Sequence, residues 1–174
     1  MKGIRASQRR GAWKLKNGQV VVVRPIRLED EPLMLELFRS FSSDTVRYRF
    51  FHIIRDMPHE ELVQYCSIDY VSELAFVAEI EERGQKQLIG VVRLCLDQEE
   101  KSGEFAVVIA DRWQKQGLGR KLVEHIIEIS KGKKMNSIYG IILADNFRMI
   151  SLVRSLGFQI KSLGDATIKA TLSL

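Results

Sequence analysis

The stretch Gln114-Lys115-Gln116-Gly117-Leu118-Gly119 lies between two segments of different periodicity, and it decides the fold. The residues before it, Glu104 to Ala110, have the composition of a strand. After it, apolar residues recur at helical spacing and predict a helix over residues 117–131; they are Leu118, Leu122, Ile126 and Ile129. Free N–H groups at a helix N-terminus bind anions, and glycines let a phosphate approach the backbone closely. The stretch therefore predicts a pyrophosphate-binding turn, with nearby positive charge from Lys115, Arg120 and Lys121.

Two other phosphate-binding motifs fit this stretch poorly. A P-loop requires Gly-Lys-Ser/Thr, whereas Gly119 is followed by Arg120-Lys121. A dinucleotide fingerprint requires a third glycine, but this chain has Leu122 at that position. It also requires an early βαβ unit, whereas the sequence before the turn predicts a meander. On these residues alone, an ordinary glycine-containing strand–helix turn remains an alternative.

The rest of the chain predicts an α+β domain with a mixed sheet. Period-two and β-branched runs predict strands, and amphipathic runs with acidic or proline starts predict helices. The expected strands cover residues 19–25, 74–80, 88–96, 104–110, 138–143, 158–163 and 166–172, and the expected helices cover residues 28–41, 58–63, 117–131 and 146–156. Short polar turns join three of these strands, between residues 74 and 110, into an antiparallel meander.

Length and composition fit one ordinary globular domain: 174 residues, 45% apolar and 28% charged. The chain has no apolar run long enough to span a membrane, and its N-terminus lacks the apolar region of a secretory signal. We therefore expect a cytoplasmic protein that does not enter the membrane. Cys66 and Cys95 are expected to be reduced thiols, and neither they nor the three histidines have metal-ligand spacing, so we expect no metal.

Positive charge is concentrated at the N-terminus. Residues 1–28 hold eight Lys or Arg and no acid, while residues 29–174 hold 19 basic and 22 acidic residues, a net charge of −3. Residues 1–17 are polar and aperiodic, and we interpret them as a flexible or loosely docked basic arm. No interleaved aromatics or nucleic-acid-reading motif accompany the charge, so nucleic-acid binding is not favoured.

Two motifs together resemble those of the GNAT acetyltransferase superfamily. Gln114-x-x-Gly117-x-Gly119 is similar to its Gln/Arg-x-x-Gly-x-Gly/Ala signature. Asn146 to Phe158 resembles its second signature, an Asn that opens a helix ending in Gly-Phe. The resemblance covers about residues 18–174 and implies a GNAT N-acetyltransferase domain. Its fold would be a mixed, mostly antiparallel sheet of six to seven strands flanked by about four helices.

Further segments look like the acetyltransferase domain of Pat-type protein lysine acetyltransferases. They are Arg24–Pro32, Arg47–Phe51, Pro58–Leu62, Ser67–Tyr70 and Gly103–Val108. Those enzymes carry this domain alone or fused to a regulatory or acyl-CoA-synthetase-like region. The chain is therefore either a standalone enzyme or a domain of a longer protein.

The resemblance implies where acetyl-CoA would bind. The cofactor would lie in a notch between the strands at 104–110 and 138–143, with its pantetheine arm paired to the backbone of Val107, Val108 and Ile109. Backbone N–H groups would hold its pyrophosphate, from Gln114, Lys115, Gln116, Gly117, Leu118, Gly119 and Arg120. Asn146 would contact the pantetheine or adenine side. Its other interpretation is a helix N-cap, and both roles are compatible.

Transfer to a lysine also needs a base, because the ε-amine has a pKa near 10.4 and its deprotonation at pH 7 costs roughly 4–5 kcal/mol. Glu104 opens an apolar strand, and the resemblance to Pat-type enzymes implies that it is the general base. The alternative is a carboxylate at an exposed strand end. Val153 occupies the position where many GNAT enzymes carry a Tyr general acid, so we assign no protein acid. The resemblance gives Cys66 and Cys95 no catalytic role.

The leading functional hypothesis is an N-acetyltransferase that moves the acetyl group of acetyl-CoA to a protein lysine by direct attack, with acyl-CoA synthetases as the implied acceptors. The Phe41–Phe51 stretch, with Tyr48, would form part of the acceptor-binding wall. Two alternatives stay open: a small-molecule or N-terminal amine acetyltransferase, and a non-catalytic acyl-CoA-sensing module.

Overall fold

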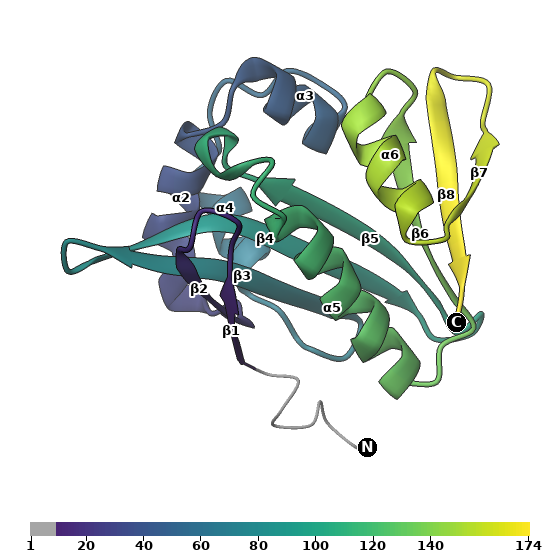
Figure 1. Cartoon of the computed structure of the whole chain (residues 1–174), viewed down its shortest axis with the longest axis horizontal. Helices are drawn as coiled ribbons and strands as arrows, with labels where there is room; N and C mark the ends of the chain where they lie inside the picture. Colours follow the sequence, from purple (N-terminus) through teal and green to yellow (C-terminus); the bar gives the residue numbers. More distant parts are fainter. Residues whose placement is uncertain (1–9) are drawn as a thin grey trace.

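Eight strands form one mixed sheet in the order β1-β2-β3-β4-β5-β6-β8-β7 (Figure 1). The computed structural model describes residues 10–174. β5 and β6 are parallel, and every other pair of neighbours is antiparallel. The strands are β1 (Gly11–Lys14), β2 (Val20–Pro25), β3 (Glu73–Glu82), β4 (Gln85–Asp97), β5 (Ser102–Ile109), β6 (Ser137–Leu143), β7 (Gln159–Ser162) and β8 (Thr167–Ser173).

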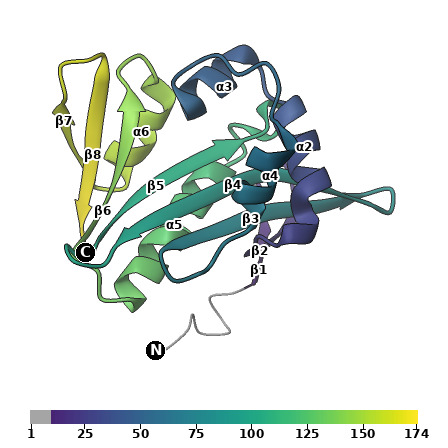
Figure 2. The same ribbon diagram turned by 180° about the vertical axis from the view of Figure 1, so that it is seen from behind.

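Helices cover both faces of the sheet (Figures 1 and 2). They are α2 (Glu31–Arg39), α3 (Ser43–Phe50), α4 (His59–Cys66), α5 (Leu118–Gly132) and α6 (Phe147–Ser155), with 3-10 turns at Leu28–Asp30 and Asp111–Trp113. α5 lies across β4 and β5 on one face, while α2 and α4 lie behind the sheet on the other. The predicted apolar stripe of α5 is buried to within 1% exposure at Leu118, Leu122, Ile126 and Ile129.

The α+β class and the GNAT-type mixed sheet are confirmed, with one more strand and one more helix than expected. The extra helix is α3, in a stretch for which the sequence predicted no helix. Ser42 caps it by accepting a hydrogen bond from the Thr45 N–H at 3.2 Å. With few apolar residues of its own, α3 has only a weak helical pattern, and tertiary contacts hold it.

The extra strand, β1, corrects the interpretation of the N-terminal arm. Gly11–Lys14 pairs antiparallel with β2, so residues 11–14 belong to the sheet instead of a loosely docked arm. Gly18, at φ +87°, makes the turn that returns the chain, and Trp13 packs edge-on against His125 of α5 at 5.6 Å. These tertiary contacts order a strand too short to show a periodic pattern. Residues 1–9, which hold the other part of the predicted arm, lie outside the described residues.

A buried ionic cluster joins β2, the first 3-10 turn and β3. Arg24, only 8% exposed, donates to both carboxylate oxygens of Asp30 at 2.7 Å each and to Oε2 of Glu79 at 2.6 Å. The hydrogen bond to Asp30 makes the largest contribution to a raised pKa for Arg24, which therefore stays charged. The cluster fixes the chain where it leaves the sheet to begin α2.

The expected absences of a membrane span and of a metal site concern two features of residues 10–174. No helix there is long and apolar enough to cross a membrane. In the same residues, no three His, Cys, Asp or Glu side chains gather as a metal-binding group.

Candidate functional site

A gap opens in the middle of the sheet where β5 and β6 diverge (Figures 1 and 2). In the described chain these strands pair at three positions, Ser102 with Ser137, Gly103 with Ile138, and Glu104 with Tyr139. Beyond Glu104, β5 continues along β4 to Ile109, while β6 continues along β8 to Leu143. One side of β5 from residue 105 to residue 109 therefore faces the gap without a partner strand.

Alternation along β5 decides which backbone groups point into the gap. The Ala110 N–H donates to the Ile89 carbonyl at 2.9 Å, so Val108 also directs its N–H and C=O toward β4, and Val107 and Ile109 direct theirs into the gap. The Ile109 carbonyl already accepts a hydrogen bond from the Gln114 side chain at 3.1 Å. Val107 thus offers the free donor and acceptor. Val108, the third residue predicted to bind pantetheine, directs its backbone groups to β4 and not into the gap. Its side chain lines the apolar pocket described below.

The turn after β5 presents a run of unpaired N–H groups. In residues 10–174, none of the six N–H groups from Lys115 to Arg120 donates to a protein oxygen. Lys115 has φ +62° and Gly117 has φ +87°, and left-handed residues interleaved in this way turn successive N–H groups toward one point. The dipole of the 15-residue helix α5 adds partial positive charge there. The turn therefore has the geometry and the partial charge of an anion site.

Side chains in this turn brace the structure. Gln114 donates to Thr45 Oγ1 and to the Ile109 carbonyl, each at 3.1 Å, and accepts from Arg148 at 3.2 Å. The Gln114 N–H donates to the Asp111 carbonyl, so the free N–H groups begin at Lys115. Gln114 therefore positions the turn. Arg120 donates to Glu124 and Ser155, which joins α5 to α6. Leu118 points into the core.

Asn146 is the N-cap of α6, as one of its two interpretations predicted. Its side-chain oxygen accepts from the Met149 N–H at 3.2 Å. The residue before it, Asp145, binds α3: Arg47 forms an ion pair with its carboxylate at 2.9 Å, and the Tyr48 hydroxyl donates to its carbonyl at 3.4 Å. These contacts join α3 to the start of α6 (Figure 1). They lie at the open end of the gap, which is the end away from the paired residues Glu104 and Tyr139.

Glu104 stands at the fork where β5 and β6 separate. Its side chain is exposed, and its neighbours in register are Cys95 on β4 and Tyr139 on β6. Burial raises the pKa of Tyr139, and the adjacent Glu104 carboxylate raises it further, so the phenol stays protonated beside the carboxylate at neutral pH. Sequence reasoning missed Tyr139, because only the parallel register of β5 and β6 brings it to Glu104.

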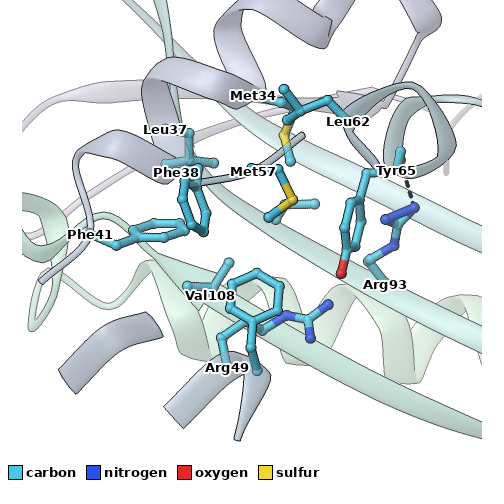
Figure 3. Close-up of a pocket in the computed structure, with 12 residues that line it drawn as sticks. Met34, Leu37, Phe38, Phe41, Arg49, Met57, Leu62, Tyr65, Arg93 and Val108 are labelled. Carbon is cyan, nitrogen blue, oxygen red and sulfur yellow. Dashed lines mark hydrogen bonds between the residues drawn. The ribbon is translucent and has the colours of Figure 1, made fainter. Parts of the chain in front are cut away.

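An apolar pocket lies on the face of β5 that carries Glu104 and Val108 (Figure 3). Elements α2, α3 and α4 enclose it against β4 and β5, and its lining is Met34, Leu37, Phe38, Phe41, Arg49, Phe50, Met57, Leu62, Tyr65, Val91, Arg93 and Val108. From the Phe41–Phe51 stretch, Phe41, Arg49 and Phe50 are among these lining residues. Tyr48 instead contacts Asp145, and Phe51 is 44% exposed outside the pocket.

Two arginines line the pocket, and they differ in how their charge is compensated. Arg93 donates to Glu73 at 2.8 Å and to the Tyr65 carbonyl at 2.6 Å, so its charge is paired. Arg49 forms no ion pair within the described residues, and burial lowers its pKa. The pocket therefore combines an apolar lining with one uncompensated cation near Glu104.

Neither cysteine has the environment of a nucleophile. Burial raises the pKa of the Cys66 thiol to about 11 and is also the main cause of a raised pKa for Cys95. Both thiols are free, and both are largely protonated at neutral pH. Val153 is fully buried in the core and supplies no acid group to the site.

The fold and this site define an acyltransferase class, and comparison with known proteins establishes it. The model of the acetyltransferase (GNAT) family matches residues 35–158. An acetyltransferase of Pseudomonas aeruginosa is 33% identical over 144 residues, which are 83% of this chain and 77% of that protein. The chain belongs to the GNAT acetyltransferase family and is an acyl-CoA-dependent N-acetyltransferase.

Solved structures share the fold at lower sequence identity. The GNAT domain of S. lividans PAT is 21% identical, with a TM-score of 0.87 over 98% of this chain and 99% of that domain. A spermidine N-acetyltransferase from Vibrio cholerae, solved in complex with CoA and spermine, is 22% identical, with a TM-score of 0.71 over 88% of this chain and 95% of that one.

Proposed function

We propose that this enzyme acetylates protein lysine ε-amines, with Glu104 as the general base. The observation that carries the proposal is the position of Glu104 at the closed end of the gap between β5 and β6. The cofactor pyrophosphate would bind the six free N–H groups of residues 115–120, and the pantetheine arm would pair with Val107. The thioester would then reach the fork, where Glu104 is located.

Glu104 has the chemistry that this step needs. It is an accessible carboxylate on the same face of β5 as the apolar pocket, so it can remove a proton from an amine that enters from that side. The neutral amine then attacks the thioester carbonyl, the C–S bond breaks and CoA leaves as its thiolate, while the nitrogen releases its second proton to water. No protein acid is required, because a thiolate is a good leaving group and takes its proton from water.

The acceptor would enter over α2, α3 and α4. An apolar lining suits the side chains that flank a lysine in a folded protein, and the likeness of Gly103–Val108 to Pat-type enzymes supports a protein acceptor such as an acyl-CoA synthetase. A polyamine is less well suited, since the positive charge of Arg49, which forms no ion pair within residues 10–174, would repel its several positive charges. A cytoplasmic location belongs to the same proposal, and the two free thiols are consistent with it.

The test compares wild type, Glu104→Gln and the control Glu99→Gln, which changes an exposed turn residue five positions earlier. Each is incubated with labelled acetyl-CoA and either purified acyl-CoA synthetase or spermidine, and CoA release and modified lysines are measured. We expect Glu104→Gln to lower transfer to lysine by about 10²- to 10⁴-fold with acetyl-CoA affinity unchanged. Glu99→Gln should match wild type.

Each other outcome selects an alternative. Full activity of Glu104→Gln would reject Glu104 as the base. Transfer to spermidine without transfer to any protein lysine would establish a small-molecule acetyltransferase. Tight binding of acetyl-CoA with no transfer to any amine would indicate a sensing module.

A further inference from the structure

The hairpin formed by β1 and β2 is fixed against α5. Leu15, in the turn of the hairpin, is 4% exposed, and its N–H donates to the Gln19 carbonyl at 2.9 Å. Trp13, two residues earlier, packs against His125 of α5. The turn of the hairpin therefore has a defined position relative to the N-terminus of that helix.

This position brings Lys16 to the phosphate-binding turn. The Lys16 N–H donates to the Gln116 carbonyl at 3.3 Å. The Lys16 Cε atom lies 3.8 Å from the point that a Cβ on Gly117 would occupy, so the side chain reaches the middle residue of the turn. A residue about 100 positions away in sequence thus lies at the rim of the same anion site.

Within residues 10–174, no carboxylate neutralises the charge of Lys16. Its side chain is exposed, and among residues 10–174 it forms no ion pair. No acid occurs between residues 10 and 28, so the hairpin contributes positive charge alone. At an ionic strength of about 0.1 M such a cation acts on anions within about 10 Å, and at lower salt its range is longer.

We infer that Lys16 is a further binding residue for the phosphates of CoA, contacting either the diphosphate or the 3′-phosphate of the nucleotide. The hairpin then has a function in cofactor binding, which accounts for part of the N-terminal positive charge. The inference rests on acyl-CoA binding at this turn, and it is independent of the identity of the acceptor and of the role of Glu104.

The test measures CoA and dephospho-CoA binding by isothermal titration calorimetry at low and at physiological salt. The variants are Lys16→Met, which keeps an apolar stem of similar length, and the matched control Lys14→Met, which removes one charge from the same hairpin. The Lys14 Cε atom lies near Gly18, at the end of the hairpin, instead of near Gly117. Circular dichroism confirms that both variants are folded.

We expect Lys16→Met to weaken CoA binding on the order of 10-fold at low salt, with a smaller loss at physiological salt. If Lys16 contacts the 3′-phosphate, dephospho-CoA affinity stays unchanged; if it contacts the diphosphate, affinity for both ligands falls. Lys14→Met should bind like wild type. Unchanged affinity of Lys16→Met for both ligands would overturn the inference, as would an equal loss in Lys14→Met. Glu104→Gln separates the two proposals, because that variant tests transfer without changing binding.

Discussion

Glu104 and Tyr139 are the last residues that pair β5 with β6, and beyond them the two strands separate. The proposed base and a protonated phenol therefore share the closed end of the gap. The parallel register places them side by side on the same face of the sheet. Their proximity can be tested without an acceptor substrate.

Glu104→Gln should lower the pKa of Tyr139, because it removes the negative charge that adds to the effect of burial. The pKa should stay above that of a free tyrosine, since burial is the larger cause. Tyrosinate absorbance during an alkaline titration measures the change, and Tyr139→Phe assigns the signal. An unaltered titration curve in Glu104→Gln would mean that the two side chains do not interact.

Gly117→Ala should weaken acetyl-CoA binding, whereas Gly119→Ala should stabilise the fold. Gly117 has φ +87°, so Ala there is strained by about 1 kcal/mol or distorts the turn, and acetyl-CoA affinity should fall. Gly119 is at negative φ, and its added Cβ would meet Ile109 and Leu152 at ordinary contact distances of 3.8 and 3.9 Å. Gly119→Ala should therefore raise the free energy of unfolding by roughly 0.5–1 kcal/mol. Urea unfolding and calorimetry measure both quantities, and equal loss of affinity in both variants would refute the distinction.

Arg24→Met should lower the free energy of unfolding by about 3–5 kcal/mol, because it leaves the buried carboxylates of Asp30 and Glu79 without their shared partner. Arg112→Met is the control, since its ion pair with Glu82 at 3.5 Å is exposed and contributes at most about 1 kcal/mol. Urea unfolding at neutral pH distinguishes them. Similar losses of unfolding free energy in the two variants would show that burial of the Arg24 cluster does not add to its effect on stability.

Asp111→Asn should destabilise the protein at neutral pH and not in acid. Hydrogen bonds from Ser42 and Thr45 hold the pKa of Asp111 below its ordinary value, although burial, the largest single contribution, acts in the opposite direction. A carboxylate with a depressed pKa stabilises the fold above its unfolded value of about 3.9, and the effect disappears as pH falls. The difference between variant and wild type should be about 1 kcal/mol at pH 7 and should shrink as the pH falls through the depressed pKa of Asp111. A difference that is constant with pH would argue for a purely steric effect.

Local patterns predicted the parts of the site that depend on local structure. The turn from Gln114 to Gly119, the amphipathic stripe of α5 and the N-cap at Asn146 are each encoded within a few residues. Long-range pairing determines the rest. The neighbour relation of Tyr139 depends on the β5–β6 register, and the place of Lys16 depends on a four-residue strand held by Trp13. Neither the β5–β6 register nor so short a strand produces a periodic pattern in the sequence.

The divergence of β5 and β6 makes part of a central strand behave as an edge strand whenever the gap is empty. Exposed edges are templates for pairing with other chains, and proteins usually cover them. A pantetheine arm paired to Val107, as proposed, would cover this one, and ligand binding at about 100 times its dissociation constant adds about 2.7 kcal/mol to stability. The cofactor would thus protect the protein from aggregation, and the lifetime of the folded enzyme would follow the supply of CoA.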